Sequence, residues 1–181
     1  MKLDYQKIIP LRYHNVSFEA DIEERIKKVV IESIQKKSSL YIYGTVGSGK
    51  THLACALVKN LLDSSIEVRF YNTGDFVEKL REEFEIGFER EDNYPGLFRE
   101  IMDFKGILVL DDIGAEKISD WVRERLYLII NKKYEDIIPI IFTSNCDMEI
   151  MSARLGDRVS SRIGQMAETI RLTSKDRRLI N

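Results

Sequence analysis

The chain has 181 residues, 44% of them hydrophobic and 32% charged, a composition typical of one globular domain with its own core. Its 28 lysines and arginines are balanced by 30 aspartates and glutamates, so the net charge of −2 does not indicate a nucleic-acid-binding protein. The N-terminal residues do not show the pattern of a secretory signal, and no apolar stretch approaches the ~18 residues of a membrane span. We therefore expect a single cytoplasmic domain over residues 1–181.

The spacing of apolar residues alternates between helical and strand patterns along the chain. In order, it predicts a helix over 21–34, a strand over 40–43, a helix over 52–62, a strand over 67–71, a helix over 75–84, a short helix over 97–102, a strand over 107–110, a helix over 120–134, a strand over 137–142, a helix over 147–163 and a strand over 168–172. This alternation predicts an α/β fold, with a mainly parallel five-stranded sheet and helices on both faces. Pro139 is unexpected in a central strand, because it removes one donor from the ladder.

A glycine-rich turn over residues 44–51 follows the first predicted strand and opens a helix. Its sequence, GTVGSGKT, matches the phosphate-binding pattern G-x-x-x-x-G-K-[ST]. Glycines permit positive φ and bring backbone N–H groups onto a phosphate, and a helix N-terminus also favours an anion. In this pattern the lysine places a charge on the β- and γ-phosphates, and the final hydroxyl ligates Mg²⁺. The predicted ATP–Mg²⁺ site consists of Gly44, Thr45, Val46, Gly47, Ser48, Gly49, Lys50 and Thr51, with His52 as a structural or base-flanking neighbour.

Two later strands end in polar residues, at the edge of the sheet where ligands bind in open α/β folds. Asp111 and Asp112 follow one strand, and Asn145 follows the next. Asp111 would hold the Mg²⁺ through water together with Thr51, and Asp112 would orient or deprotonate the attacking water. Asn145 would hydrogen-bond the γ-phosphate or that water.

Taken together, these motifs resemble the AAA+ helicase-loader family of DnaC and DnaI, to which the transposition helper IstB is related. The residues LVLDDIG over 108–114 are similar to the family's Walker B motif, and TSN over 143–145 to its sensor 1. The residues RLGDRVSSRI over 154–163 resemble the segment that carries the arginine finger, with Arg162 in the finger position and Arg158 one turn before it. The residues LTSKDRR over 172–178 are similar to the closing motif, in which Arg178 would be the sensor 2 arginine.

The resemblance covers nearly the whole chain and implies a P-loop AAA+ core with little or no helical lid domain. Residues 1–20, with IPLRY over 9–13, would form the segment beside the nucleotide. Because this segment begins so early, we do not expect the family's N-terminal helicase-binding domain, and the chain would be a truncated piece or a naturally minimal form.

The resemblance also implies an ATPase that turns ATP over after assembly into a homo-oligomer. Its partners would be single-stranded DNA and a replicative helicase, and its role that of a helicase loader in DNA replication. The implied catalytic residues are Lys50, Asp111, Asp112, Asn145, Arg178 and, acting in trans, Arg162.

Two alternatives stay open. An IstB-like transposition helper would prefer duplex DNA and a transposase, and a non-hydrolysing module would use ATP only to switch assembly.

Residues 82–92 are strongly acidic with a single base, Arg90, so this stretch repels phosphates. A groove that binds DNA would then have to be formed by basic and aromatic residues elsewhere in the chain. The alternative is that these basic residues form a solvated surface and these aromatic residues pack in the core. The candidates are Arg69, Lys79, Arg81, Lys105, Phe84 and Phe88.

Overall fold

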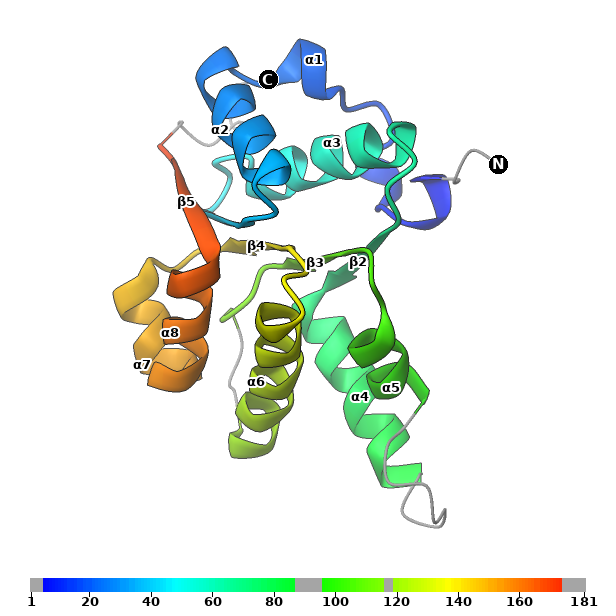
Figure 1. The fold of residues 1–181 in the computed structure, drawn as a ribbon, viewed down its shortest axis with the longest axis vertical. Coiled ribbons are helices and arrows are strands. Elements are labelled where there is room, and N and C mark those ends of the chain that lie inside the picture. Colours follow the sequence, from blue (N-terminus) through cyan, green and yellow to red (C-terminus); the bar gives the residue numbers. More distant parts are fainter. Residues whose placement is uncertain (1–4, 87–95, 116–118, 174–181) are drawn as a thin grey trace.

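A computed structural model describes residues 5–86, 96–115 and 119–173 of the chain (Figure 1). Its centre is a five-stranded sheet in the order β2-β3-β4-β1-β5, and every neighbouring pair is parallel. The strands are β1 (Ser39–Gly44), β2 (Val68–Asn72), β3 (Ile107–Asp111), β4 (Ile140–Ser144) and β5 (Ala167–Leu172). The predicted parallel α/β fold is confirmed, and the strand before the glycine-rich turn, β1, lies between β4 and β5.

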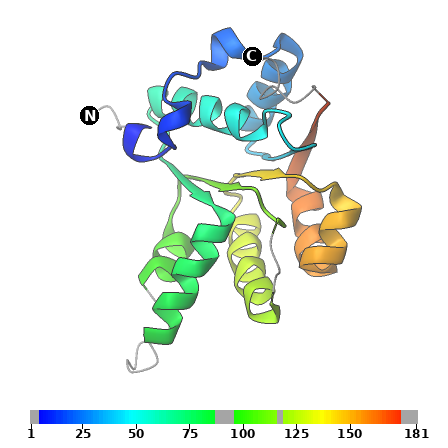
Figure 2. The ribbon, with the colours of Figure 1, turned by 180° about the vertical axis from the view of Figure 1, so that it is seen from behind.

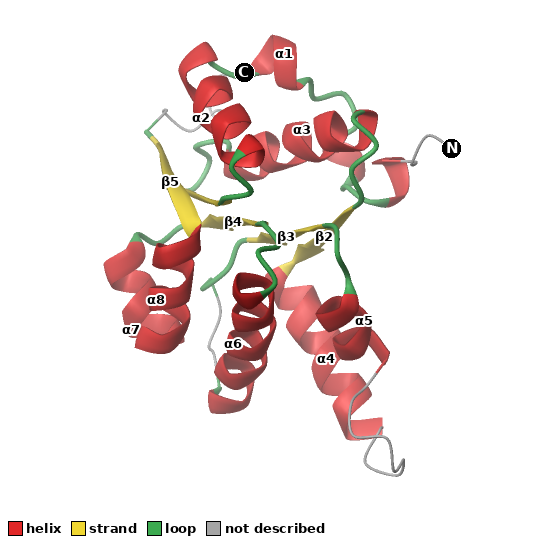
Figure 3. Ribbon diagram, in the orientation of Figure 1, coloured by secondary structure: helices red, strands yellow, loops and turns green. Residues whose placement is uncertain are grey.

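Helices cover both faces of the sheet, as the alternation of elements predicted (Figures 1 and 3). One face carries α1 (Phe18–Asp21), α2 (Glu24–Gln35) and α3 (Lys50–Asp63). The other carries α4 (Thr73–Ile86), α5 (Gly96–Asp103), α6 (Asp120–Glu135), α7 (Met148–Leu155) and α8 (Asp157–Met166). Figure 2 shows the same two layers from behind. Two 3₁₀ turns, Tyr5–Lys7 and Leu11–Tyr13, precede α1 and pack against α3.

Successive residues of the central strands point to opposite faces and so build two separate cores. Leu40 and Ile42 of β1 lie in the core under α2 and α3, whereas Tyr41 between them lies in the core under α4 to α8. In β3, Val109 faces the first core and Leu110 the second. Since both faces are covered, these strands are apolar at almost every position, which explains their continuous apolar runs in the sequence.

The single helix predicted over 147–163 is wrong, because the structure has two helices there, α7 and α8, that meet at Gly156 and pack against each other. Gly156 has φ 86° and ψ 159°, a backbone conformation that residues with a side chain rarely adopt. The buried residues Met151, Leu155, Val159 and Ile163 recur every four positions across this break. The apolar spacing therefore conceals it.

The first predicted helix, over 21–34, also differs from the structure. It begins later, at the start of α2, because Ile22 is extended and separates α2 from α1. Pro139 does not interrupt the ladder, since β4 begins at Ile140. Among the residues that the structure describes, no helix follows β5, and no helix is long and apolar enough to cross a membrane.

Candidate active site

The glycine-rich turn joins β1 to α3 at the carboxyl edge of the sheet. β1 ends at Gly44 and α3 begins at Lys50, two residues before the predicted helix start at His52. Gly49 precedes the helix with φ 96°, in the left-handed region where glycine is unstrained. A helix N-terminus at this position favours an anion, because its first-turn N–H groups carry the positive end of the helix dipole.

Gly44 lies directly against the neighbouring strand β5. A Cβ atom on Gly44 would lie 2.3 Å from the backbone oxygen of Leu172 and 3.0 Å from Ser48 Oγ. Because a backbone oxygen in a strand cannot turn aside as a long side chain can, a larger residue would separate β5 from β1 or displace the turn. The first glycine of the motif is therefore a packing requirement of the sheet.

Lys50 is 7% exposed, and its ammonium group lies inside the turn. Lys50 Nζ donates hydrogen bonds to the backbone oxygens of Gly44 at 3.1 Å and Thr45 at 2.9 Å. A lysine is this deeply buried only where its charge has partners. These contacts hold the charge at the centre of the motif, within reach of a phosphate bound by the turn.

Asp111, the last residue of β3, connects the turn to the sheet. The Thr51 hydroxyl donates to the Asp111 carboxylate, 3.0 Å from Oδ1 and 3.1 Å from Oδ2, and Thr143 of β4 donates to Oδ1 at 2.6 Å. The Thr73 hydroxyl donates to the Asp111 backbone oxygen at 2.8 Å. A hydroxyl and a carboxylate thus converge beside the turn, and oxygen ligands of this kind suit a Mg²⁺ that also binds phosphate and water. The residues present fit the predicted metal.

The environment of Asp111 changes its proton affinity. Burial raises the pKa of the Asp111 carboxyl above its ordinary value of 3.8, and the neighbouring charge of Asp112 acts in the same direction. The hydrogen bonds from Thr143 and Thr51 and the charge of Lys50 lower the pKa, because they stabilise the carboxylate. A divalent cation bound at this carboxylate would lower the pKa of Asp111 further, because the cation also favours the charged form.

Asp112 and Asn145 form a pair at the ends of β3 and β4. Asn145 Nδ2 donates to Asp112 Oδ1 at 2.8 Å. Asp112 has φ 60°, a left-handed conformation in which aspartate is enriched among non-glycine residues. Its N–H group donates to Thr143 Oγ1 at 2.8 Å, which helps to fix this conformation. A carboxylate oriented by an amide is able to hold and deprotonate a water molecule.

Thr143 therefore contacts both aspartates, a role that sequence analysis did not predict. Thr73 was not identified from the sequence at all. Threonine is a common residue at strand ends, so its presence alone carried no signal. The missing information was the strand order, which places β4 beside β3 and brings the Thr143 hydroxyl to the end of β3.

The segment after Asp112 is fixed to β4 and to α7. The Ile113 N–H donates to the Thr143 oxygen at 2.8 Å, and the Ser144 hydroxyl donates to the Ile113 oxygen at 2.7 Å. Arg154 of α7 donates to the backbone oxygen of Gly114. The backbone that follows the two carboxylates is therefore held by β4 and α7.

Two clefts flank the turn, with volumes of about 520 and 460 Å³, and both include Gly49 and His52. The smaller cleft is also lined by Arg12, Tyr13 and Asn15 of the N-terminal segment. His52 Nε2 lies 3.6 Å from Asp21 Oδ2, and its ring meets the Tyr13 ring edge-to-face at a centroid distance of 6.5 Å. The structure thus places the N-terminal segment beside the turn, with His52 between the two.

Arg162 lies on α8, on the opposite face of the sheet from α3 (Figure 1). Its Nε donates to Asn131 Oδ1 of α6 at 2.8 Å, its Nη1 donates to Gln165 Oε1 at 2.8 Å, and its guanidinium lies 4.6 Å from the centre of the Tyr134 ring. These contacts belong to α6 and α8, so the structure does not bring Arg162 together with the turn of the same chain. Arg178 lies outside the described residues.

The basic residues considered for a DNA groove mostly have acidic neighbours. The ion pairs are Arg69 with Glu100, Arg81 with Glu78 and Lys105 with Asp136. These contacts favour the interpretation of a solvated charged face.

Phe84 is a packing residue. Its ring meets Phe98 and Trp121 edge-to-face at 5.8 and 5.1 Å, and the Arg125 guanidinium lies 4.8 Å from its centre. Stacking on a nucleic-acid base would require these contacts to break. Phe88 and Arg90 lie outside the described residues.

Comparison with known proteins places this geometry in a family. Residues 3–167 match the family described as "IstB-like ATP binding protein". The chain is 29% identical over 161 residues to the insertion sequence IS5376 putative ATP-binding protein of Geobacillus stearothermophilus, covering 87% of this chain and 60% of that protein. It is 26% identical over 160 residues to the replicative helicase loader DnaI of Bacillus subtilis, covering 79% of this chain and 48% of that protein. The chain thus spans roughly half the length of the curated relatives it matches.

The fold agrees with these matches. The crystal structure of the DnaC helicase loader superposes with a TM-score of 0.76 at 27% identity, covering 92% of this chain and all of that one. The family match covers most of the chain and includes the turn, both aspartates and Asn145. The chain therefore belongs to the family of IstB-like ATP-binding proteins, with the AAA+ fold of the DnaC helicase loader.

Proposed function

We propose that the chain is an ATP-hydrolysing AAA+ subunit that works when assembled with further copies of itself. The observation that carries the proposal is the convergence of catalytic groups from separate strands beside the glycine-rich turn. Thr51 lies within 3.1 Å of both Asp111 carboxylate oxygens, and Asn145 donates to Asp112 at 2.8 Å. These contacts support the assignment of one residue each to binding a phosphate, ligating a cation and orienting a water.

In this proposal the turn over residues 44–51 binds the β- and γ-phosphates of ATP. Lys50 exchanges its contacts with the Gly44 and Thr45 oxygens for phosphate oxygens. Thr51 and Asp111 would hold Mg²⁺, which would act as a Lewis acid and stabilise the negative charge of the phosphates.

Asp112 and Asn145 act on the attacking water. Asn145 holds the carboxylate of Asp112 in a fixed direction. That carboxylate accepts a proton from the water while the oxygen of the water bonds to the γ-phosphorus. The bond from the γ-phosphorus to the bridging oxygen breaks, so the products are ADP and inorganic phosphate.

Arg162 supplies a cation to the neighbouring subunit in this proposal. An arginine supplied to the transferring phosphoryl group is worth ~10³–10⁵ in rate. The contacts of Arg162 with α6 support a role outside its own site, since no described residue of the turn touches it. Arg178 would act as a second arginine, as the family resemblance implies.

For the process served, we propose loading of a replicative helicase in DNA replication, with ATP-dependent binding of single-stranded DNA. The similarity to the helicase loaders DnaI and DnaC supports this role. A second candidate is an ATP-binding helper of a transposase on duplex DNA, which the family match and the insertion-sequence relative favour. A homo-oligomer formed on nucleotide binding is common to both.

The enzymatic part is tested by mixing two variants that are each expected to be inactive. Lys50→Ala subunits keep Arg162, and Arg162→Ala subunits keep an intact turn, so mixed assemblies should recover part of the ATPase activity. Recovery supports catalysis in trans. Absence of recovery despite demonstrated co-assembly contradicts it.

The process is tested by fluorescence anisotropy with a labelled single strand and the duplex of the same sequence. ATP-dependent preference for the single strand supports helicase loading, and preference for the duplex supports the transposition role. Either affinity should fall steeply between low and moderate salt, because bound counterions are released. No binding to either form at low salt would leave a switch that acts on proteins alone.

A further inference from the structure

The side chain of Arg162 is fixed by contacts with α6 and α8. The proposed function requires the arginine itself but does not by itself require these contacts. Three contacts hold the side chain: Nε with Asn131 Oδ1, Nη1 with Gln165 Oε1, and the guanidinium plane with the Tyr134 ring. Arg162 is partly buried, and two of these contacts come from α6. A long, flexible side chain is thereby confined to one orientation.

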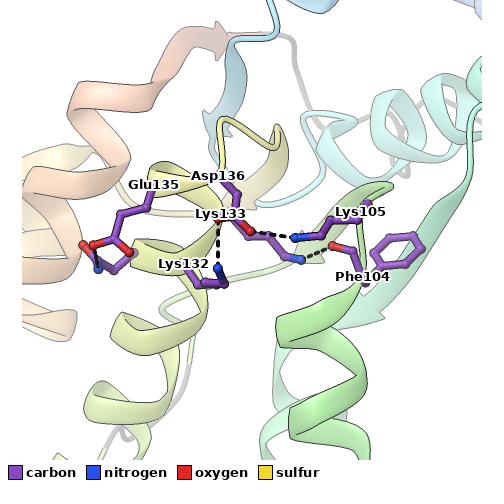
Figure 4. Close-up of polar contacts among 7 residues, drawn as sticks. Phe104, Lys105, Lys132, Lys133, Glu135 and Asp136 are labelled. Carbon is purple, nitrogen blue, oxygen red and sulfur yellow. Dashed lines mark hydrogen bonds and ion pairs between the residues drawn. The ribbon is translucent and has the colours of Figure 1, made fainter.

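Asn131 has its own orienting partner. Its Nδ2 donates to Glu135 Oε1, one turn along α6, at 2.8 Å (Figure 4 labels Glu135 and draws this contact). If the Asn131 amide were rotated by half a turn, its NH₂ group would face the Arg162 donor and its oxygen would face a carboxylate, and both arrangements are repulsive. Glu135 therefore fixes the direction in which Asn131 presents its oxygen to Arg162.

A second arginine of α8 also contacts α6. Arg158, one turn before Arg162, lies 4.0 Å from the centre of the Tyr127 ring. A hydrogen bond from Arg158 and the charges of Arg158 and Arg162 lower the pKa of Tyr127 below its ordinary value of 10.0. Both guanidinium groups thus act on the same tyrosine, and the Glu135 carboxylate accepts a hydrogen bond from Asn131. Such a surface suits a polyanion such as the triphosphate of a second copy of the chain.

We propose that Asn131 is a positioning residue that holds Arg162 in the orientation in which it reaches the nucleotide of a neighbouring subunit. This inference rests on the proposed role of Arg162 in trans. The physical reason is preorganisation: a guanidinium already fixed by an amide and a ring loses less freedom when it binds a phosphate oxygen. Asn131 does not touch the reacting atoms and acts through Arg162 alone.

The test introduces Asn131→Ala either into the subunit that supplies Arg162, the donor, or into the subunit whose turn binds ATP, the acceptor. In the donor arrangement, Lys50→Ala/Asn131→Ala subunits are mixed with Arg162→Ala subunits, so the altered surface must supply the arginine. In the acceptor arrangement, Lys50→Ala subunits are mixed with Arg162→Ala/Asn131→Ala subunits, so the arginine comes from an unaltered surface. We expect ATPase recovery to fall at least ~10-fold in the donor arrangement, since a misplacement of about 1 Å can cost ~10²-fold. Recovery in the acceptor arrangement should equal that of the parent pair.

Matched variants separate positioning from folding. Lys132 follows Asn131 on α6 but pairs with Asp136 instead (Figure 4), so Lys132→Ala in the donor should leave recovery unchanged. Glu135→Gln keeps an acceptor for Asn131 Nδ2 and should recover more activity than Glu135→Ala. Thermal unfolding and assembly of each variant are measured alongside.

Each remaining outcome contradicts the inference in a recognisable way. Equal loss in both arrangements would show a structural role for Asn131, and no loss in either would show that Arg162 needs no positioning. A gain in the donor arrangement would mean that Asn131 restrains the arginine. If the parent pair of Lys50→Ala and Arg162→Ala itself fails to recover, the proposed trans role fails first.

Discussion

A hydrogen bond of 2.8 Å from Asn145 Nδ2 to Asp112 Oδ1 joins the carboxyl ends of two neighbouring strands. Asp112→Asn keeps the size of the side chain and an oxygen that can accept from Asn145, but it removes the group that takes a proton. We expect ATP affinity close to that of the wild type and a fall in kcat of ~10²–10⁴, the usual worth of a general base.

Nucleotide titration and steady-state phosphate release measure these two quantities. Asn145→Ala serves as the comparison, because it leaves the carboxylate and removes only its orientation, so turnover should fall less. If Asp112→Asn lost binding and turnover to the same extent, Asp112 would belong to the ligands of the metal.

Lys50→Ala removes the charge at the centre of the glycine-rich turn. We expect the affinity for a fluorescent ATP analogue to be lost within the range of the titration, because the β- and γ-phosphates lose their cation. Lys79→Ala, which removes an exposed positive charge from α4, should bind normally. Circular dichroism establishes that both variants fold, and near-normal binding by a folded Lys50→Ala variant would refute the assignment of the turn.

Gly44→Ala tests the close approach of β5 to the turn. The added Cβ would lie 2.3 Å from the Leu172 oxygen, so we expect the free energy of unfolding to fall by ~1–3 kcal/mol, as for other overpacked sites. Gly164→Ala is the control, because a Cβ on this exposed α8 residue meets only Met148 Cε at 3.7 Å. It should stabilise the fold by up to ~1 kcal/mol. Urea unfolding curves that ranked the two variants in the reverse order would contradict the packing described for Gly44.

Lys133 is fully buried at the end of α6, where its ammonium group donates to the Phe104 backbone oxygen beside Lys105 (Figure 4). Burial, reinforced by the charge of Lys105, lowers the pKa of Lys133 from 10.5 to about 8. The native state therefore releases this proton near pH 8, whereas the unfolded chain keeps it until about pH 10.5. Between these values the unfolded state binds more protons, so the contribution of Lys133 to stability rises with pH.

Lys133→Met keeps the length of the side chain and removes the titrating group. We expect the difference in free energy of unfolding, wild type minus variant, to increase from pH 8 to 10.5, by at most ~1.4 kcal/mol per pH unit for one proton. Urea unfolding at several pH values measures it, and Lys79→Met, which alters an exposed residue, should show a flat difference. A difference for Lys133→Met that stays constant or falls over this range would show that the ammonium is not desolvated.

Sequence patterns predicted the strands, the turn and the carboxylates because each depends on residues close together in the chain. Lys50, Thr51 and the end of β1 belong to one short motif, and Asp111 ends an apolar run. Contacts between separate helices and strands could not be predicted from such local patterns. Thr143, for example, contacts Asp111 only because β4 lies beside β3. Asn131 was overlooked for the same reason, since its partner Arg162 lies 31 positions later on another helix. The break at Gly156 was missed because the apolar spacing continues through it.

The strand order has a consequence for the order in which the protein can fold during synthesis. β1 is made early, but both of its neighbours, β4 and β5, come from the last part of the described chain, and the hydrogen bond from Ile140 to Ser39 spans 101 positions. A growing chain that has reached Pro139 therefore holds an apolar strand with both edges unpaired among the described strands. Such segments are prone to wrong pairing and aggregation, and pairing over long separations is slow. Until β4 and β5 emerge, β1 stays unpaired among the described strands, and the turn that follows β1 reaches its final surroundings only when these last two strands are in place.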